Sequence, residues 1–447
     1  MILEDLASRV ITLAKNEGAT AAECTVSEGE HFSANVRMGE VESLKDAGSR
    51  GAGVRVLVGK HTGSAYTSDL SDEGIRHMVA SALELAKITS EDPFAGLPDE
   101  SELGKITEDL CLYSDSVMDL PAARKIEWAK QAEAAALSAD PRIANSEGAS
   151  CDTHLGTSVF ANSLGFLGSY RSSSCSLSAV PVAKQNGSME RDFWFSIARS
   201  VDGLESPEQV GRRAAERALR RLGARKVATQ KAPIVFEPRV ARSLLDNIFD
   251  AISGDSVYRG ETFLADKLGQ KIASDKLTVI DDATIPRLFG SSPFDDEGIP
   301  SRRTMVIEDG VLQSWLLNSY TARKLGMKTT GNASRGITGN AGVGHGNFYI
   351  PNGSQPPADI IKSIRRGLFV TELIGFGVNV VTGDYSRGAS GLWIENGELT
   401  YPVSEVTIAS TLPEMLMNLE AIGSDLEFRG ALASPTLLIS EMTISGH

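Results

Sequence analysis

Histidine and cysteine are scarce in this sequence, which has 6 histidines and 4 cysteines among 447 residues. No cysteine follows Cys175, and the only later histidines are His345 and His447. A catalytic zinc site takes three protein ligands from His, Cys, Asp or Glu and leaves one position for water. No two histidines have the HExxH spacing of a zinc-binding helix. The sequence therefore argues against a histidine-rich zinc site.

Long hydrophobic runs are absent as well. No stretch reaches the roughly 18 consecutive apolar residues that a membrane-spanning helix needs. Glu4, Asp5 and Arg9 interrupt the apolar residues at the start of the chain, so it lacks the apolar core of a signal peptide. The four cysteines form no CxxC pair, which favours reduced and mostly buried thiols. We expect a cytoplasmic protein that does not contact a membrane.

Basic residues do not exceed acidic ones: 44 Lys and Arg stand against 58 Asp and Glu, a net charge of -14. Because broad phosphate binding needs a surplus of basic side chains, the composition argues against nucleic acid as a partner. One stretch after Ser206 is nevertheless rich in arginine, with glutamates interleaved, and we interpret it as a solvated helix face. Its basic residues are Arg212, Arg213, Arg217, Arg220, Arg221, Arg225 and Lys226.

The pattern of apolar residues predicts an α+β protein with two domains, residues 1–223 and 232–447. The first is expected to be an α/β domain with a mixed or antiparallel sheet and helices, and the second to be β-rich, like a barrel or a sandwich. Asn396-Gly397 and Asp309-Gly310 have the composition of tight hairpin turns. The predicted helices are 3–17, 71–87, 121–137, 207–222 and 240–252. The predicted strands include 22–26, 32–38, 53–58, 159–161, 166–178, 192–198, 232–236 and 277–280.

Two acidic clusters are candidate metal ligands. Asp246 and Asp250 lie one turn apart on the helix 240–252, with Asn247 between them, and could hold a divalent cation through oxygen atoms. A solvated helix face explains the same residues, and we favour it. In the loop that holds Asp295 and Asp296, a turn whose carboxylates accept hydrogen bonds from backbone amides is favoured over a metal site.

A glycine-rich stretch, residues 370–391, is the most distinctive part of the sequence. Small residues let another backbone come close, so this stretch could form a groove for an extended peptide. Tight turns in a crowded β domain are an equal alternative. The candidate peptide-binding residues are Gly383, Asp384, Tyr385, Ser386, Arg387 and Gly388.

This stretch and the following residues 393–402 resemble the C-terminal signature of the PmbA/TldE proteins in the TldD/PmbA metallopeptidase family, also called modulator of DNA gyrase. Residues 320–326, 295–300 and 251–254 are similar to that family too. The resemblance implies a TldE-like subunit of a heteromeric TldD/TldE metalloprotease, in which the TldD-type chain carries zinc. Such proteases act on short or unfolded peptides, in peptide antibiotic maturation and antitoxin degradation.

The zinc motif of the TldD-type chains, HExxxH, is not present here. By position, Asp246 and Asn247 stand where the first His and the Glu would be, and Ala251 where the second His would be. A late cysteine ligand is missing as well. The resemblance therefore implies no catalytic residue, metal or cofactor in this chain, with zinc in the TldD-type partner.

The expected partners are that TldD-type subunit, a second copy of this chain when it is alone, and peptide substrates. One alternative is an autonomous metal-dependent hydrolase with acidic ligands. The other is a gyrase- or DNA-associated modulator that uses the arginine-rich helix.

Overall fold

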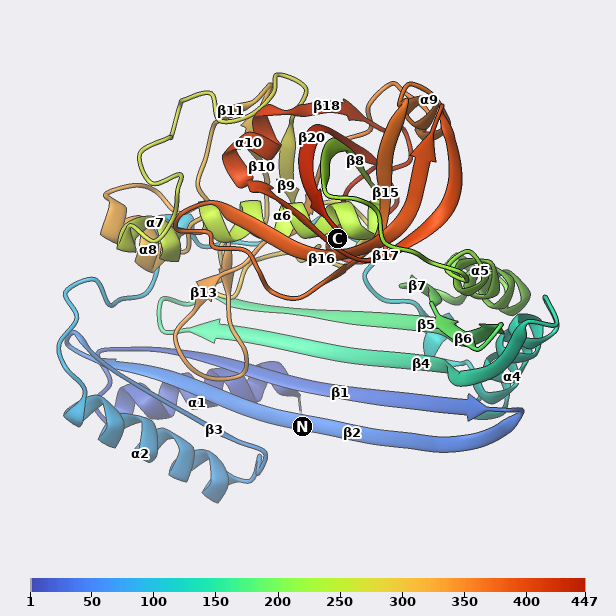
Figure 1. The fold of residues 1–447 in the computed structure, drawn as a ribbon. Helices are drawn as coiled ribbons and strands as arrows, with labels where there is room; N and C mark the ends of the chain where they lie inside the picture. Colours follow the sequence, from blue (N-terminus) through green and yellow to red (C-terminus); the bar gives the residue numbers. More distant parts are fainter. Residues whose placement is uncertain (1, 447) are drawn as a thin grey trace.

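The computed structural model describes residues 2–446, and its first part is a seven-stranded antiparallel sheet that curves as a half-barrel (Figure 1). The strand order is β3-β2-β1-β4-β5-β6, and β7 also pairs with β5. The strands are β1 (Ala21–Arg37), β2 (Glu40–Val58), β3 (His61–Thr67), β4 (Ile143–Asn162), β5 (Leu167–Gln185), β6 (Ser188–Arg191) and β7 (Trp194–Ala198). The helices are α1 (Leu3–Asn16), α2 (Asp72–Ile88), α3 (Asp115–Met118), α4 (Ala122–Leu137) and α5 (Pro207–Leu219).

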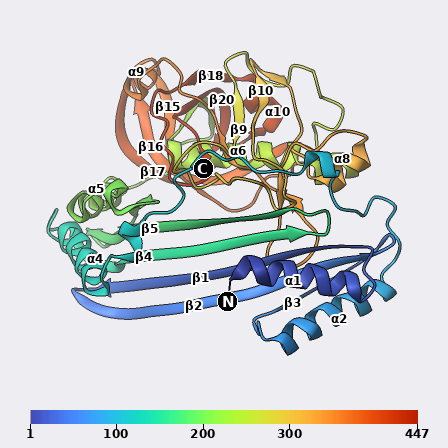
Figure 2. The same ribbon diagram turned by 180° about the vertical axis from the view of Figure 1, so that it is seen from behind.

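Two pairs of helices cover opposite ends of this sheet (Figures 1 and 2). The apolar stripes of α1 and α2 pack at one end, where Leu6 and Val79 join the core that contains Val54 of β2. At the other end α4 and α5 pack closely, since a Cβ added at Gly211 would lie 2.1 Å from the Ala132 carbonyl oxygen. Small residues thus bring these two helix backbones together.

The strands of the sheet are longer than the sequence pattern predicts. Residues 22–26 and 32–38 lie largely in one strand, β1, because residues 27–31 stay paired with β2 and β4 despite their polar, turn-like composition. Helix α5 has the predicted capping box at Ser206 but ends at Leu219, and the chain turns at Gly223 with a φ of 77°.

The second part of the molecule contains a closed five-stranded barrel and a second sheet. The barrel order is β17-β16-β15-β8-β20, and it closes because β17 also pairs with β20. The second sheet has the order β11-β10-β9-β14-β19. The strands are β8 (Gln230–Phe236), β9 (Val279–Asp282), β10 (Arg303–Glu308), β11 (Val311–Leu312), β12 (Ala333–Ser334), β13 (Gly342–Val343), β14 (Asn347–Tyr349), β15 (Arg366–Ile374), β16 (Asp384–Glu395), β17 (Glu398–Thr411), β18 (Leu419–Ile422), β19 (Leu432–Ala433) and β20 (Leu437–Ser445). The helices are α6 (Pro238–Ile252), α7 (Gly254–Arg259), α8 (Ser319–Leu325), α9 (Pro357–Lys362) and α10 (Leu412–Met417).

Closure of the barrel leaves no unpaired edge in its five strands, which protects a β-rich unit from association through open edges. Asn396 and Gly397 turn between β16 and β17 with φ values of 53° and 81°, the left-handed conformation that a two-residue hairpin requires. The predicted α+β class, with a sheet and helices followed by a barrel, is confirmed. So is the predicted hairpin turn at Asp309-Gly310. The strand predicted at 277–280 lies two residues further on, at Val279–Asp282.

Helix α6 lies between the barrel and the first sheet in both views (Figures 1 and 2). Its apolar stripe, which includes Leu245, Ile248 and Ile252, is buried in the core shared with the barrel. The remaining strip of the helix carries its charged residues. No helix in residues 2–446 is both long and apolar enough to cross a membrane.

A loop of the second part reaches back onto the first sheet. We call residues 335–341, between β12 and β13, the strap. Arg335 at its start forms an ion pair with Glu23 of β1, which also pairs with Arg55 of β2 at 2.5 Å, and these side chains are almost fully buried. Burial would raise the pKa of Glu23, but the two guanidinium groups lower it. The strap therefore holds the second part against the first sheet through buried ion pairs.

Candidate functional site

A cavity of about 660 Å³ lies between helix α6, strands β15 and β16, and the segment that joins β6 to β7. Its size is within the range of small-molecule and peptide sites, and it lies between two parts of one chain, where such sites are common. Its lining carries both acidic and basic side chains. The ionisable residues are Asp192, Arg239, Arg242, Asp246, Asp250, Glu372 and Arg387.

Helix α6 supplies four of these charges. Arg239, Arg242, Asp246 and Asp250 follow one another at intervals of three or four residues, so they share one strip beside the buried stripe. The arginines are nearer the N-terminal end and the aspartates nearer the C-terminal end. This order opposes the helix macrodipole, which favours acidic groups at the start and basic groups at the end. The helix macrodipole therefore does not explain this order of charges.

The two aspartates of α6 face the cavity without partners. In residues 2–446, no hydrogen bond or ion pair joins the carboxylate of Asp246 or Asp250 to another side chain or to the backbone. Partial removal from water raises the pKa of both carboxyls. For Asp246, Arg242 opposes this rise, while the charge of Asp250 adds to it. Both groups are exposed to the cavity, so they are open to a ligand.

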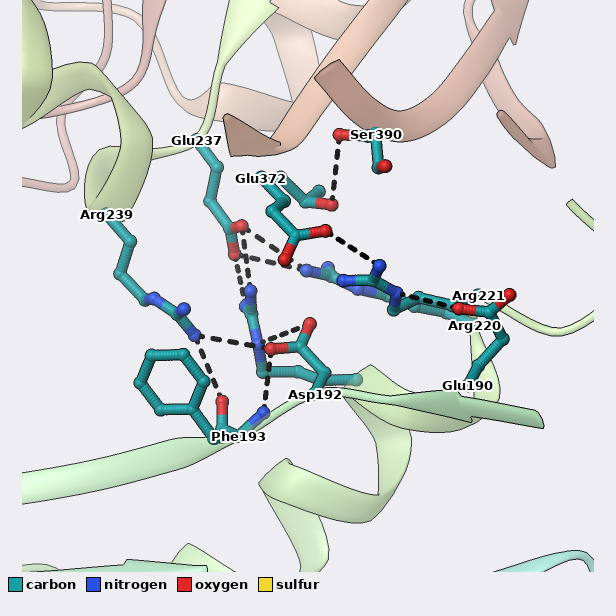
Figure 3. A network of polar contacts seen from close by, with 11 residues as sticks. Glu190, Asp192, Phe193, Arg220, Arg221, Glu237, Arg239, Glu372 and Ser390 are labelled. Atoms are coloured by element: carbon teal, nitrogen blue, oxygen red, sulfur yellow. Dashed lines mark hydrogen bonds and ion pairs between the residues drawn. The ribbon is translucent and has the colours of Figure 1, made fainter. Parts of the chain in front are cut away.

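Ion pairs join the walls of the cavity to helix α5, and Figure 3 shows them from close by. Asp192 pairs with Arg217 of α5 at 3.3 Å and with Arg239 of α6 at 3.7 Å. Glu372 of β15 pairs with Arg221 of α5 at 2.7 Å. The carboxylates of Asp192 and Glu372 are thus already paired with arginines. They hold the fold together and are not free to bind a ligand.

The prediction of a solvated arginine face on α5 is wrong for part of that helix. Arg217 and Arg220 both pair with Glu237, the residue just before α6, and only 7% of the Arg217 side chain is exposed. Arg213 keeps the expected exposed position, with 53% of its side chain accessible. The inner arginines join the two parts of the chain, so they are not available to nucleic acid.

The residues on α6 do not fit a zinc ion. Ala251 is buried and has no ligating atom, and Asn247 donates its side-chain amide to the Ser243 carbonyl at 2.9 Å. Zinc would need a third ligand beside the two aspartates. In the part of the chain that is described, no three His, Cys, Asp or Glu side chains are grouped as a metal ion would require.

Of the six predicted groove residues, one lines the cavity and five do not. Tyr385 is only 2% exposed and lies in the barrel core, so the prediction that it contacts a peptide is wrong. Gly383 has a φ of 83° and packs on Pro413. Asp384 and Ser386 are exposed but lie outside the cavity lining, as does Gly388. Only Arg387 reaches the cavity, opposite α6.

The acidic loop after β9 is a separate feature. The carboxylate of Asp295 accepts hydrogen bonds from the backbone amides of Glu297, Ile299 and Ala333, at 2.9–3.0 Å. The interpretation of this segment as a hydrogen-bonded turn is confirmed. Asp295 and Asp296 line a different cavity, of about 290 Å³, so the structure does not unite them with Asp246.

Several residues of the cavity were not singled out from the sequence, among them Arg242, Asp192 and Glu372. The reversed order of charges along α6 was the one signal that could have identified Arg242 as part of a site. The other two come from segments that are distant in the sequence, and only the packing of the two parts brings them together.

The fold defines a class of protein in which a half-barrel sheet is followed by a closed barrel, with a charged cavity where the two meet. Family models place the chain within that class: residues 22–86 match domain 1, 116–222 the central domain and 229–446 the C-terminal domain of the PmbA/TldA metallopeptidases. The chain belongs to the PmbA/TldD metallopeptidase family.

Individual relatives agree with this. Metalloprotease PmbA of Escherichia coli O157:H7 is 42% identical over 446 residues, which cover 100% of this chain and 96% of that protein. Haemophilus influenzae has both a metalloprotease PmbA homolog, 39% identical, and a metalloprotease TldD homolog, 24% identical over 89% of this chain and 87% of that protein.

Solved structures share the whole architecture. A structure from Bacteroides thetaiotaomicron named as a modulator of DNA gyrase is 28% identical, with a TM-score of 0.93 over 99% of both chains. TldE from Thermococcus kodakarensis, 22% identical, has the same fold, with a TM-score of 0.88 over 99% of this chain and all of that one.

Proposed function

We propose that this chain is a TldE-like subunit of a heteromeric TldD/TldE-type metalloprotease that acts on short or unfolded peptides, and that it holds peptide without cleaving it. The observation that carries this proposal is the composition of α6. At the positions where the zinc motif would supply its ligands, this helix has Asp246, Asn247 and Ala251. A hydrolytic zinc centre would then belong to a TldD-type partner.

Two further observations support the proposal. One organism has relatives of both kinds, a PmbA homolog and a TldD homolog. In addition, the cavity offers unpaired charges of both signs and no grouped metal ligands in the described residues, which suits binding better than metal-assisted hydrolysis.

A DNA-associated role is not favoured, because the inner arginines of α5 are engaged in ion pairs. An autonomous hydrolase with acidic ligands would have to use Asp246 and Asp250, and it is therefore tested in the same experiment.

The test is peptide cleavage by the purified chain, alone and mixed with the TldD-type protein of the same organism, with the zinc content of each sample measured. We expect cleavage only in the mixture and zinc only in the partner. Cleavage by this chain alone that is lost in Asp246→Ala but kept in Asp266→Ala, an exposed carboxyl outside the cavity, would establish an autonomous hydrolase instead.

A further inference from the structure

Four charged side chains in the cavity make no direct contact with a protein partner, although Arg242 and Arg387 lower the pKa of Asp246 from a distance. No ion pair or hydrogen bond to the side chains of Arg242, Asp246, Asp250 or Arg387 is found among residues 2–446. Arg242 and Asp246 are four residues apart on α6, a spacing that permits an ion pair, yet they do not form one within 4.0 Å. The cavity therefore has two cationic and two anionic groups that are free to meet a ligand.

Arg387 is the most informative of these groups. It comes from β16, on the side of the cavity opposite α6, and its Nε atom is covered by protein without a hydrogen-bond acceptor. A covered donor without an acceptor costs free energy, and the rest of this half-buried guanidinium lines the cavity, where it can donate to an acceptor that arrives from outside. The planar fork of arginine donors matches a carboxylate, which it can bind through two parallel hydrogen bonds.

The rim of the cavity adds an apolar surface. Phe376, in the loop between β15 and β16, has a fully exposed side chain, and Ile374 beside it is 57% exposed. Phe193, from the β6–β7 segment, is 40% exposed and lies at the same cavity. Exposed apolar side chains around a charged cavity fit a ligand that has charged ends and apolar side chains.

We infer that this cavity binds a short peptide by its charged groups, with Arg387 and Arg242 holding the carboxylate and Asp246 and Asp250 holding a cationic group. This inference rests on the proposed peptide-holding function and names the form of peptide that is held. The carboxylate can come from the C-terminus or from an acidic side chain, and the choice of probe separates these sources.

The experiment is calorimetric titration of the purified full-length chain with four probes. They are a tetrapeptide of apolar residues with free termini, its C-terminal amide, its N-acetyl form, and an amidated peptide of the same length with one internal aspartate. We expect binding of the free peptide and at least about tenfold weaker binding of its amide, since a charge-assisted hydrogen bond contributes at least that factor. Restored binding by the aspartate-containing amide would assign the carboxylate to a side chain, and no restoration would assign it to the terminus.

Variants locate the binding in this cavity. Arg387→Gln should abolish the distinction between free and amidated peptide, whereas Arg365→Gln, an exposed arginine at the other end of the barrel strands, should keep it. Asp246→Asn should weaken the binding of the free peptide and leave the binding of the N-acetyl form unchanged. Equal affinity for free and amidated peptides, or an unchanged distinction in Arg387→Gln, would overturn the inference. The proposed function fails separately, through cleavage by this chain alone.

Discussion

Replacement of Arg217 by alanine is expected to destabilise the protein more than any substitution on the outer face of α5. The Arg217 side chain is 7% exposed and joins Glu237 and Asp192, whose side chains are 13% and 6% exposed. Removing one partner of a buried ion pair costs about 3–5 kcal/mol, since the remaining charge stays buried without compensation. Here Arg220 still reaches Glu237 at 3.3 Å, and Arg239 reaches Asp192 at 3.7 Å. We therefore expect the lower end, about 3 kcal/mol.

Urea unfolding followed by circular dichroism measures this loss. With slopes of about 1–3 kcal/mol per M, a loss of about 3 kcal/mol lowers the midpoint by about 1 M or more. The matched control is Arg213→Ala on the same helix, where the side chain is 53% exposed and the loss should stay below about 1 kcal/mol. Equal midpoints for the two variants would refute the view that buried ion pairs hold the two parts together.

Two further predictions concern α6 and the strap. Asp250→Asn should stabilise the protein at neutral pH by about 0.5–1 kcal/mol, because it removes a negative charge near the C-terminal end of the helix. The fold raises the pKa of Asp250, so the native state binds this proton more readily than the unfolded chain, and the wild type loses stability as pH rises through the native pKa. The gain in the variant should therefore grow as the pH rises above about 4, the ordinary pKa of an aspartate, and a gain that is independent of pH in urea titrations would contradict this. Gly53→Ala should displace the strap, because the new Cβ would lie 1.5 Å from the Ile337 carbonyl oxygen, and should speed proteolysis within the strap. Gly48→Ala, whose nearest contact is at 4.0 Å, is the control, and equal cleavage of both variants would be evidence against the strap contact.

Local features of the fold were predictable from the sequence. The four longer helices of the first part, the capping box at Ser206 and the hairpin turn at Asn396-Gly397 follow from patterns within a few residues, and all are present. The long strands were not predictable in full. The polar middle of β1 remains extended only because β2 and β4 pair with it on both sides. Strand pairing of that kind depends on distant segments.

The candidate site was predictable only in pieces. Asp246, Asp250 and Arg387 were all noted, but in two unrelated contexts, a helix face and a glycine-rich groove. The sequence gives no distance between α6 and β16, so it could not show that these residues line one cavity. Tyr385 was included because it lies in the glycine-rich stretch, and glycine content does not tell which side chains of a strand point into the core of a closed barrel.

The sequence by itself determined the family, the α+β class, and the main helices of the first part together with α6, because each depends on which residues are present and on short-range spacing. The tertiary structure alone decided which charges are paired. It turns Arg217 inward to Glu237 and Asp192, and it leaves Asp246 and Arg387 facing a shared cavity without partners. The physical reason is that ion pairing and burial depend on distances between segments far apart in the chain, which are set when the barrel closes and packs against the half-barrel sheet.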